Sequence, residues 1–320
     1  MPLNLTLAFS SHRPEILPLA EEQMTRCDQI IVEEPATPEF ERLLAGKLSP
    51  EDYLQTIDFE YPDFMRATAR LLQRLAGRGT VVWACEPFIE RLMEIHEHLG
   101  DGGRPEDFRH DSRLWPVYAA EREATGRLLA FYNAAAENDF DRLLATVCTF
   151  AAADADRFAL RDRLRARAIA ERLKDREGRV YIEAGYLHLR LLKELRRLLP
   201  PEAVIRPYFL LRDVYRAAGR RAHFYGPGDR LTLALIFGQT PTIERQHLLA
   251  ARSLIYNRLI YMAESAPGDD LFPDAAEEIL VIACVDRLTL TECRRLHARL
   301  RGLDSLAARR SLVGLPPPPA

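Results

Sequence analysis

Five short apolar segments, separated by amphipathic stretches, dominate the pattern of this chain. The apolar segments lie at about 3–9, 29–33, 80–85, 179–184 and 203–209. Most are rich in β-branched residues and almost continuously apolar, which is typical of strands buried on both faces of a sheet. Because helical patterns separate them, parallel βαβ connections are expected. The pattern therefore predicts an α/β fold with a mainly parallel central sheet flanked by helices.

The rest of the chain predicts helices. Between about 100 and 178, a glycine-rich loop precedes helical patterns at about 114–135, 138–156 and 157–175. We interpret this stretch as a helical insertion that packs on the sheet or covers its edge. Further helical patterns lie at about 229–237, 242–265, 274–285 and 290–310. We predict an α/β domain over 1–210, a helical carboxyl-terminal region over 211–314 and an extended or disordered proline-rich tail over 315–320.

Two of the apolar segments end in a small-residue turn that is followed by a histidine. The first runs from Leu5 to His12, and the second runs from Val180 to His188. In open α/β sheets the carboxyl ends of the strands form the edge where ligands bind. Two histidines at the same edge would meet around one substrate or metal ion. The alternative is that each histidine caps the helix that follows it.

Acidic residues also mark the predicted strand ends. Glu33 and Glu34 close the second strand, Glu86 closes the third, and Glu183 lies within the fourth. A carboxylate inside an apolar strand is costly unless it is paired, hydrogen-bonded or bound to a cation. Glu183 therefore requires a basic partner or a functional role. Consecutive residues on an extended strand face opposite ways, so at most one of Glu33 and Glu34 is expected in a shared site unless the turn at Pro35 redirects the other.

Composition restricts the classes of protein to which the chain can belong. It has 320 residues with a net charge of −3, and a dedicated nucleic-acid binder needs a basic surplus instead. The five cysteines are scattered without a CxxC pair, which indicates a reducing compartment rather than a disulfide framework. No secretory signal and no apolar run long enough to span a bilayer is visible. We expect a cytoplasmic protein that binds neither nucleic acid nor membranes.

Four motifs occur in an order that resembles a known superfamily. The first motif is a strand that leads to a histidine, Phe9 to His12, followed by the acidic strand end Ile30 to Glu34. The second is the segment Val81 to Arg91, and the third is the helix opening Leu160 to Arg163. The fourth is the glycine-x-x-histidine motif Gly185 to His188. This order resembles the superfamily that joins TraB/PrgY proteins, Tiki proteases, ChaN-like proteins and erythromycin esterases. The resemblance covers roughly residues 3–200.

The resemblance implies three kinds of chemistry. The resemblance to Tiki proteins implies metal-dependent peptide hydrolysis through paired histidines and acidic residues. The resemblance to erythromycin esterases implies ester hydrolysis in which histidine and glutamate act on water without a required metal. The resemblance to ChaN-like members implies binding of a haem-like cofactor. The resemblance therefore indicates a fold more closely than a reaction.

The candidate site combines the two histidines with the carboxylates of the strand ends. The candidate catalytic residues are His12, His188, Glu34, Glu86 and Arg161. The candidate metal ligands are His12, His188, Glu33 and Glu183. Nitrogen and oxygen ligands of this mixture suit Mn²⁺, Co²⁺ or Zn²⁺, and without a metal a histidine could act as the base. Tyr186, inside the second motif, is a candidate for contact with a ligand or cofactor.

Arg161 has two interpretations. Its guanidinium could pair with a carboxylate or an anionic intermediate, because it forks onto two oxygens. The alternative is a solvated helix face shared with Arg163, Arg165, Arg167 and Arg172.

The leading hypothesis is a hydrolase of peptide or ester bonds that acts on a small molecule or peptide, either with a divalent metal (Mn²⁺, Co²⁺ or Zn²⁺) or without a cofactor. Two alternatives remain open. One is a non-catalytic protein of the same fold that binds a small molecule or haem. The other is an oligomeric interaction protein, such as a homodimer formed through residues beyond 210.

Overall fold

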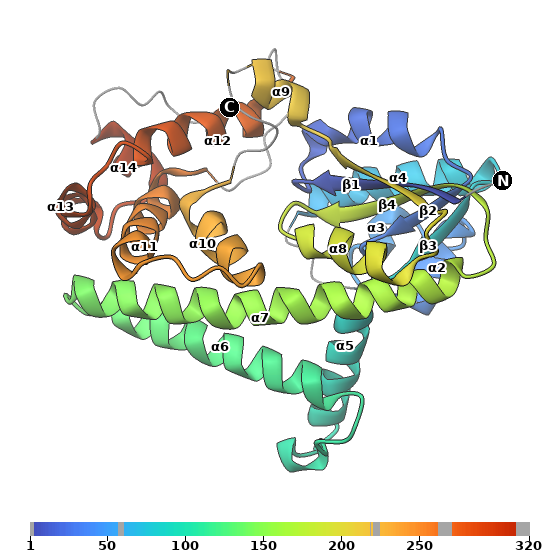
Figure 1. The fold of residues 1–320 in the computed structure, drawn as a ribbon, viewed down its shortest axis with the longest axis horizontal. Helices are drawn as coiled ribbons and strands as arrows, with labels where there is room; N and C mark the ends of the chain where they lie inside the picture. Colours follow the sequence, from blue (N-terminus) through green and yellow to red (C-terminus); the bar gives the residue numbers. More distant parts are fainter. Residues whose placement is uncertain (1–2, 57–60, 218, 220–224, 262–270, 312–320) are drawn as a thin grey trace. The chain divides into compact units, whose positions relative to one another are not determined.

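The centre of the fold is a five-stranded sheet in which every strand pair is parallel, in the order β3-β2-β4-β1-β5 (Figure 1). This is a computed structural model that describes residues 3–56, 61–217, 219, 225–261 and 271–311. The strands are β1 (Leu3–Ser10), β2 (Gln29–Val32), β3 (Val81–Ala84), β4 (Gly178–Gly185) and β5 (Val204–Phe209). The prediction of an α/β fold with a mainly parallel sheet is confirmed.

The register of the strands brings several strand ends to one level. β1 pairs with β4 from Leu3 opposite Gly178 to Ser10 opposite Gly185. β2 pairs with the other side of β4, with Ile31 opposite Ile182. The residues that follow β1, β2 and β4 therefore leave the sheet along the same carboxyl edge.

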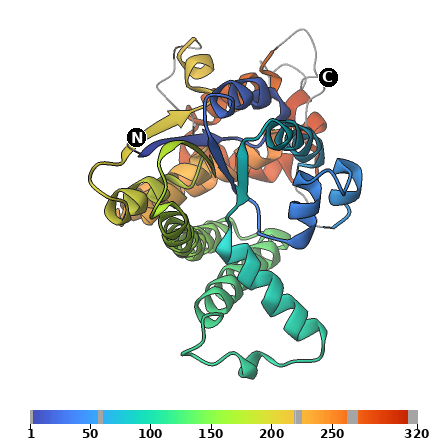
Figure 2. The same ribbon diagram turned by 90° about the vertical axis from the view of Figure 1, so that its right-hand side faces the viewer.

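Helices cover both faces of the sheet, with α7 and α8 on one side and α1 and α4 on the other (Figure 2). Alternate apolar residues of β1 and β4 pack in one buried cluster with α7 and α8, through Leu5, Leu7, Val180, Ile182, Ile169 and Leu191. Because strand side chains alternate, the residues between them face α1 and α4. This alternation decides which side of the sheet each acidic residue occupies.

The chain divides into two compact units. Unit 1 comprises 1–117 and 160–212, and unit 2 comprises 118–159 and 213–320. The helices of unit 1 are α1 (Leu17–Met24), α2 (Pro38–Leu44), α3 (Pro50–Tyr53), α4 (Pro62–Gly77), α5 (Pro87–Gly100) and α8 (Leu189–Leu198), with short 3₁₀ turns at Pro14–Ile16 and Pro105–Asp107. Unit 1 thus holds the whole sheet, although the chain enters it twice.

Unit 2 is helical in its described residues. It contains most of α6 (Trp115–Ala136) and α9 (Arg212–Ala217), the first part of α7 (Phe140–Leu173), α10 (Pro227–Ile236), α11 (Ile243–Leu259), α12 (Pro273–Val285), α13 (Leu290–Leu300) and α14 (Ser305–Arg310). Its core joins α7 to the carboxyl-terminal helices through Leu144, Leu231, Ile255, Val281 and Leu300. We interpreted about 100–178 as an insertion on the sheet. The middle of this region, 118–159, belongs to unit 2 and packs with the carboxyl-terminal helices.

The helices differ from the predicted helical patterns at two places. The patterns at 138–156 and 157–175 form one continuous helix, α7, because no glycine or proline interrupts the chain between them. The single helix predicted at 290–310 is two helices, α13 and α14, because the chain turns at Gly302 with φ +79°. The proline-rich tail lies outside the described residues. Among the helices described here, none combines the length and the apolar character needed to cross a bilayer.

Gly178, the first residue of β4, generates a prediction about stability. It has φ +96°, and an added Cβ would lie 2.9 Å from Asp28 Oδ2, the carboxylate that accepts from Arg179 N. Gly178→Ala should lower the free energy of unfolding of unit 1 by about 1–3 kcal/mol. A positive φ is strained for alanine, and the added methyl group would collide with the Asp28 carboxylate. Urea unfolding followed by tryptophan fluorescence measures this, since Trp83 and Trp115 both lie in unit 1.

The matched control is Gly77→Ala at the end of α4, where φ is not positive and nothing lies within 4 Å of an added Cβ. Alanine is the better helix former, so this variant should be as stable as the parent or more stable by up to about 1 kcal/mol. Equal stability of the two variants would contradict the structural account of Gly178.

Candidate functional site

The two histidines of the strand-turn-histidine motifs lie against the same glycine. A Cβ added to Gly185 would meet His188 Cδ2 at 3.3 Å, His12 Cε1 at 3.4 Å and Glu33 Oε2 at 3.7 Å. The parallel register of β1 and β4 causes this, because both motifs leave the sheet at the same level. The structure therefore brings His12, His188 and Glu33 together at the carboxyl edge, and a side chain at position 185 would press between them.

His12 sits in an unusual backbone conformation. Its φ is 53°, in the left-handed region that residues other than glycine seldom adopt. The His12 amide donates to Ser10 Oγ at 3.0 Å, and its ring lies 5.4 Å from the ring of Phe64 on α4. This conformation turns the chain at the strand end and leaves the imidazole partly exposed. Strained residues of this kind cluster at functional sites, so the observation favours a functional role for His12.

Glu33 is the most heavily bonded side chain of the site. Its Oε1 lies 2.9 Å from His188 Nε2 and 3.4 Å from an Arg161 nitrogen. Its Oε2 accepts from Gly185 N at 2.7 Å and lies 3.1 Å from an Arg165 nitrogen. Burial alone would raise the pKa of Glu33, but the charges of His188 and Arg165 hold it well below the ordinary value. Glu33 is therefore a permanently ionised carboxylate.

His188 lies between two carboxylates. Its Nδ1 is 2.5 Å from Asp162 Oδ1, and its Nε2 faces Glu33. Burial alone would lower the pKa of His188, but the charges of Glu33 and Asp162 raise it to about 9. At neutral pH the ring is consequently an imidazolium that donates from both nitrogens, and it has no lone pair to offer a metal ion or a proton.

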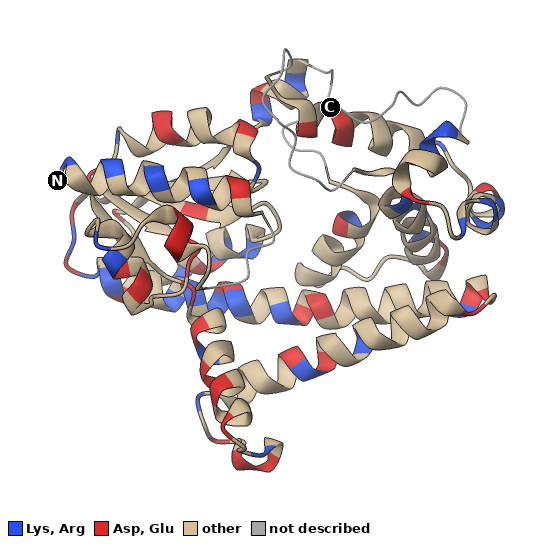
Figure 3. Ribbon diagram, turned by 180° about the vertical axis from the view of Figure 1, so that it is seen from behind, with Lys and Arg blue, Asp and Glu red and all other residues tan. Residues whose placement is uncertain are grey.

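Arg161 and Arg165 reach the same cluster from α7, whose arginines are visible in Figure 3. Arg165 is fully buried and donates to two backbone carbonyls, Cys85 O at 2.9 Å and Glu183 O at 2.7 Å. The alternative of a solvated arginine face is therefore wrong for these two residues, although it holds for Arg167, which is exposed. The guanidinium of Arg165 fastens the ends of β3 and β4 together.

Glu86 lies beneath the two arginines. It is 1% exposed, and its oxygens lie 3.5 Å from Arg161 Nε and 3.8 Å from Arg165 Nε. Burial raises the pKa of Glu86, and the charge of Arg161 opposes this. A side chain this enclosed is suited to holding Arg161 in place rather than to contact with a substrate.

Glu34 and Glu183 occupy the other face of the sheet. Burial together with the charges of Glu183 and Glu33 raises the pKa of Glu34 well above the ordinary value, and the neighbouring Tyr53 hydroxyl opposes the rise. Burial also raises the pKa of Glu183, whose Oε2 accepts from Glu33 N at 3.4 Å, while the charge of His12 opposes the rise. Both side chains therefore retain protons more readily than an ordinary glutamate.

The site consequently has two halves. The α7-side half consists of Glu33, Glu86, Arg161, Asp162, Arg165 and His188. The α4-side half consists of His12, Glu34, Tyr53 and Glu183. Strand alternation explains why consecutive Glu33 and Glu34 fall in different halves.

Three residues of the site were not among the sequence-based candidates. Asp162 and Arg165 carry contacts as short as those of the candidates, and Tyr53 lies beside Glu34. Arg161 and Arg165 are four apart, so they share a helix face, and this spacing was a usable signal. Tyr53 gave no signal, because it comes from a short helix that no strand motif precedes.

The described side chains of the site offer few ligands to a divalent metal ion. Among the described residues, no group of three or more histidine, cysteine, aspartate or glutamate side chains is placed to hold an ion. Both His188 nitrogens and both Glu33 oxygens already have partners, as described above. The residues present do not fit a metal in this conformation, and the metal stays a prediction.

Tyr186 lies beside the cluster and is partly exposed. Its amide donates to Ser10 O at 3.0 Å, which ties the end of β4 to the end of β1. Its role toward a cofactor stays a prediction.

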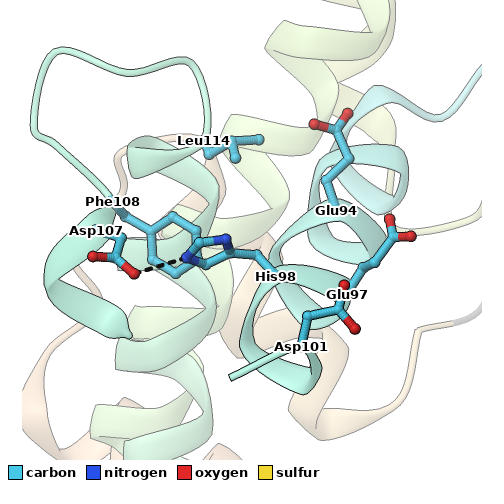
Figure 4. Close-up of a pocket in the computed structure, with 7 residues that line it drawn as sticks. All are labelled: Glu94, Glu97, His98, Asp101, Asp107, Phe108 and Leu114. Atoms are coloured by element: carbon cyan, nitrogen blue, oxygen red, sulfur yellow. Dashed lines mark hydrogen bonds and ion pairs between the residues drawn. The ribbon is translucent and has the colours of Figure 1, made fainter. Parts of the chain in front are cut away.

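A hollow lies beside α5, lined by residues other than those of the candidate site (Figure 4). It has a volume of about 480 Å³ and is lined by Glu94, Glu97, His98, Asp101, Asp107, Phe108 and Leu114. His98 Nε2 is 2.9 Å from Asp107 Oδ2, and its ring packs against Gly103. His98 thus has a structural partner, and the acidic lining is explained as a solvated helix face.

Comparison with known proteins gives one similarity over most of the chain. No family model matches the chain, and no solved structure matches it. The chain is similar to an uncharacterized protein of Archaeoglobus fulgidus, with 27% identity over 296 residues. The alignment covers 92% of this chain and 98% of the relative, so it spans residues of both units.

Arg165 yields a prediction about the stability of unit 1. Arg165→Met should lower the free energy of unfolding by about 3–5 kcal/mol, because it leaves two buried carbonyls without their donor and removes one of the cations paired with buried Glu33. Arg167→Met, an exposed change two residues away on the same helix, should shift it by no more than about 0.5 kcal/mol. The same urea titration checks both, and a loss below about 1 kcal/mol for Arg165→Met would be inconsistent with the described bonds.

His188 yields a prediction about pH. Its pKa in the folded protein, about 9, lies above the ordinary value of 6.5, so its stabilisation is complete below about pH 6.5 and is lost as the pH rises through 9. The stability advantage of the parent over His188→Gln should therefore shrink by about 3 kcal/mol between about pH 6 and pH 9.5. Urea titrations of both proteins across this range test it, and an advantage that stays constant or grows would refute the imidazolium assignment.

Proposed function

We propose that this protein is a hydrolase of ester or peptide bonds whose site lies at the carboxyl edge of the sheet. One observation carries the proposal: His12, His188 and Glu33 meet at Gly185 on the carboxyl edge, where the pKa values of consecutive Glu33 and Glu34 are shifted in opposite directions. Titratable groups whose surroundings push their pKa values apart are the usual arrangement of a general acid beside a fixed charge. A cluster that served only stability would not require this division.

His12 is our candidate for the general base. It is the more exposed of the two histidines, since His188 is buried between two carboxylates. A water molecule placed beside its ring could give up a proton to the imidazole while the water oxygen attacks a carbonyl carbon. The strained backbone at His12 supports this role, because it directs the ring toward Gly185 and the carboxylates.

Glu34 is our candidate for the general acid. Its pKa is raised well above the ordinary value by burial, it is partly exposed, and it lies on the same side of the sheet as His12. In the second step the bond from the carbonyl carbon to the leaving oxygen or nitrogen breaks, and Glu34 donates its proton to that atom. His12 then returns the proton it took from water, by way of solvent, to Glu34. Glu183, which is 6% exposed, interacts electrostatically with both Glu34 and His12.

Arg161 is our candidate for stabilising the anionic intermediate. Its side chain is 20% exposed, whereas that of Arg165 is fully buried, so Arg161 is the guanidinium within reach of a bound molecule. A planar guanidinium placed in a partly desolvated site stabilises an oxyanion effectively. Glu33 and Glu86 hold Arg161 in position from the opposite side.

The proposal predicts that hydrolysis depends on His12. On a panel of p-nitrophenyl esters and short fluorogenic peptides, His12→Ala should lower kcat/KM for an active substrate by about 10²–10⁴-fold, because it removes the proton acceptor. The rates are measured with EDTA and separately with Mn²⁺, Co²⁺ and Zn²⁺, which also tests the expected metal.

The matched control for this assay is His96→Ala, which changes an exposed histidine on α5 in the same unit. It should leave kcat/KM within about twofold of the parent. Two results would count against the proposal: no hydrolysis of any substrate under any of these conditions, or equal losses in the two variants.

A further inference from the structure

Asp162, His188 and Glu33 form an unbroken chain of short contacts that ends on the backbone of β4. Asp162 Oδ1 is 2.5 Å from His188 Nδ1, and His188 Nε2 is 2.9 Å from Glu33 Oε1. Glu33 Oε2 then accepts from Gly185 N at 2.7 Å. The side chains of Asp162, His188 and Glu33 are 0%, 4% and 7% exposed, so water competes little for these contacts.

We propose that Asp162 is a positioning residue of the site: by holding His188, it fixes the Glu33 carboxylate against the Gly185 amide. A histidine ring is oriented by the hydrogen bond that its other nitrogen makes. His188 is the residue before α8, Asp162 comes from α7 and Glu33 follows β2, so the chain fastens three separate elements.

The burial of Asp162 itself argues for such a role. It is fully buried, and among the described residues its second oxygen, Oδ2, accepts no hydrogen bond. Burying an incompletely bonded carboxylate costs stability, and an apolar residue at this position of α7 would avoid that cost. Residues that break a local rule in this way are expected where function requires them.

Glu33 connects the two halves of the site. Its side chain belongs to the α7-side half, whereas its backbone N donates to Glu183 Oε2 at 3.4 Å in the α4-side half. The His12 ring lies against Gly185 beside the Glu33 carboxylate, so displacing this carboxylate is expected to disturb His12 as well. This consequence for catalysis rests on the proposed function, whereas the positioning of Glu33 does not.

The test is an NMR comparison of two neighbouring backbone amides in the full chain. Asp162→Asn keeps the shape of the side chain and removes its charge. We expect the Gly185 amide, which bonds Glu33, to move upfield and to exchange with solvent about tenfold faster. The Tyr186 amide bonds Ser10 O instead, so its shift and exchange should stay unchanged. A general loosening of the end of β4 would change both amides.

Two variants complete the experiment. Asp175→Asn changes an exposed aspartate after α7 and should leave both amides unchanged. Asp162→Ser removes the charge with a smaller side chain, and it replaces Asp162→Asn in the comparison if that variant does not fold. The proposal is overturned if the Gly185 amide stays unchanged in the folded variant, or if the Gly185 and Tyr186 amides change equally.

Hydrolysis supplies a second and separate readout. With an ester that the parent cleaves, Asp162→Asn should lower kcat by about tenfold and leave KM within about twofold, because substrate contacts are not removed. If the parent protein cleaves no ester, the hydrolase proposal fails, and the amide comparison alone tests the positioning role of Asp162. If only the Gly185 amide changes and kcat does not, the positioning of Glu33 by Asp162 is supported, but its expected effect on catalysis is refuted.

Discussion

The ion pairing of Glu33 is the interaction on which the rest of the site depends. This carboxylate lies at the end of a buried strand, where an isolated charge would be prohibitive. Four donors from three elements compensate for it: His188, Arg161, Arg165 and the Gly185 amide. Each donor is in turn held by something else, since Asp162 holds His188 and Glu86 holds the arginines. The network therefore stabilises the strand ends and also determines which carboxylates are ionised and which retain protons.

The sheet gives this network its division into two chemical environments. Because side chains alternate across a strand, Glu33 faces the arginines of α7 while Glu34 faces Tyr53 and Glu183. The α7 side contains the guanidinium groups of Arg161 and Arg165, and the α4 side contains the Tyr53 hydroxyl and the Glu183 carboxyl. The pKa values of two identical side chains one residue apart are therefore shifted in opposite directions.

Much of this arrangement could be predicted from the sequence, and the limit has a physical origin. The β-branched segments gave the parallel sheet, and the matching motifs at His12 and His188 placed both rings at one edge, because parallel strands end at a common level. The roles of the residues were harder. His188 appeared equivalent to His12, yet Asp162 and Glu33 make it a cation. That difference depends on contacts from α7, and the arginine-rich pattern of this helix also suits a solvated face.

Unit 1 is assembled from two stretches of chain, 1–117 and 160–212, and this order affects how the protein is synthesised. Glu33 and Glu86 emerge from the ribosome well before Arg161, Arg165 and His188, the cations that neutralise them. During that interval the two carboxylates have only water as a partner, so β2 and β3 cannot be sealed in a dry core. The sheet can close only after β4 has been translated and inserted between β1 and β2, its neighbours in the strand order. Pairings that span such long sequence separations form slowly, and the nascent amino-terminal half is therefore the part of this protein most dependent on protection by chaperones.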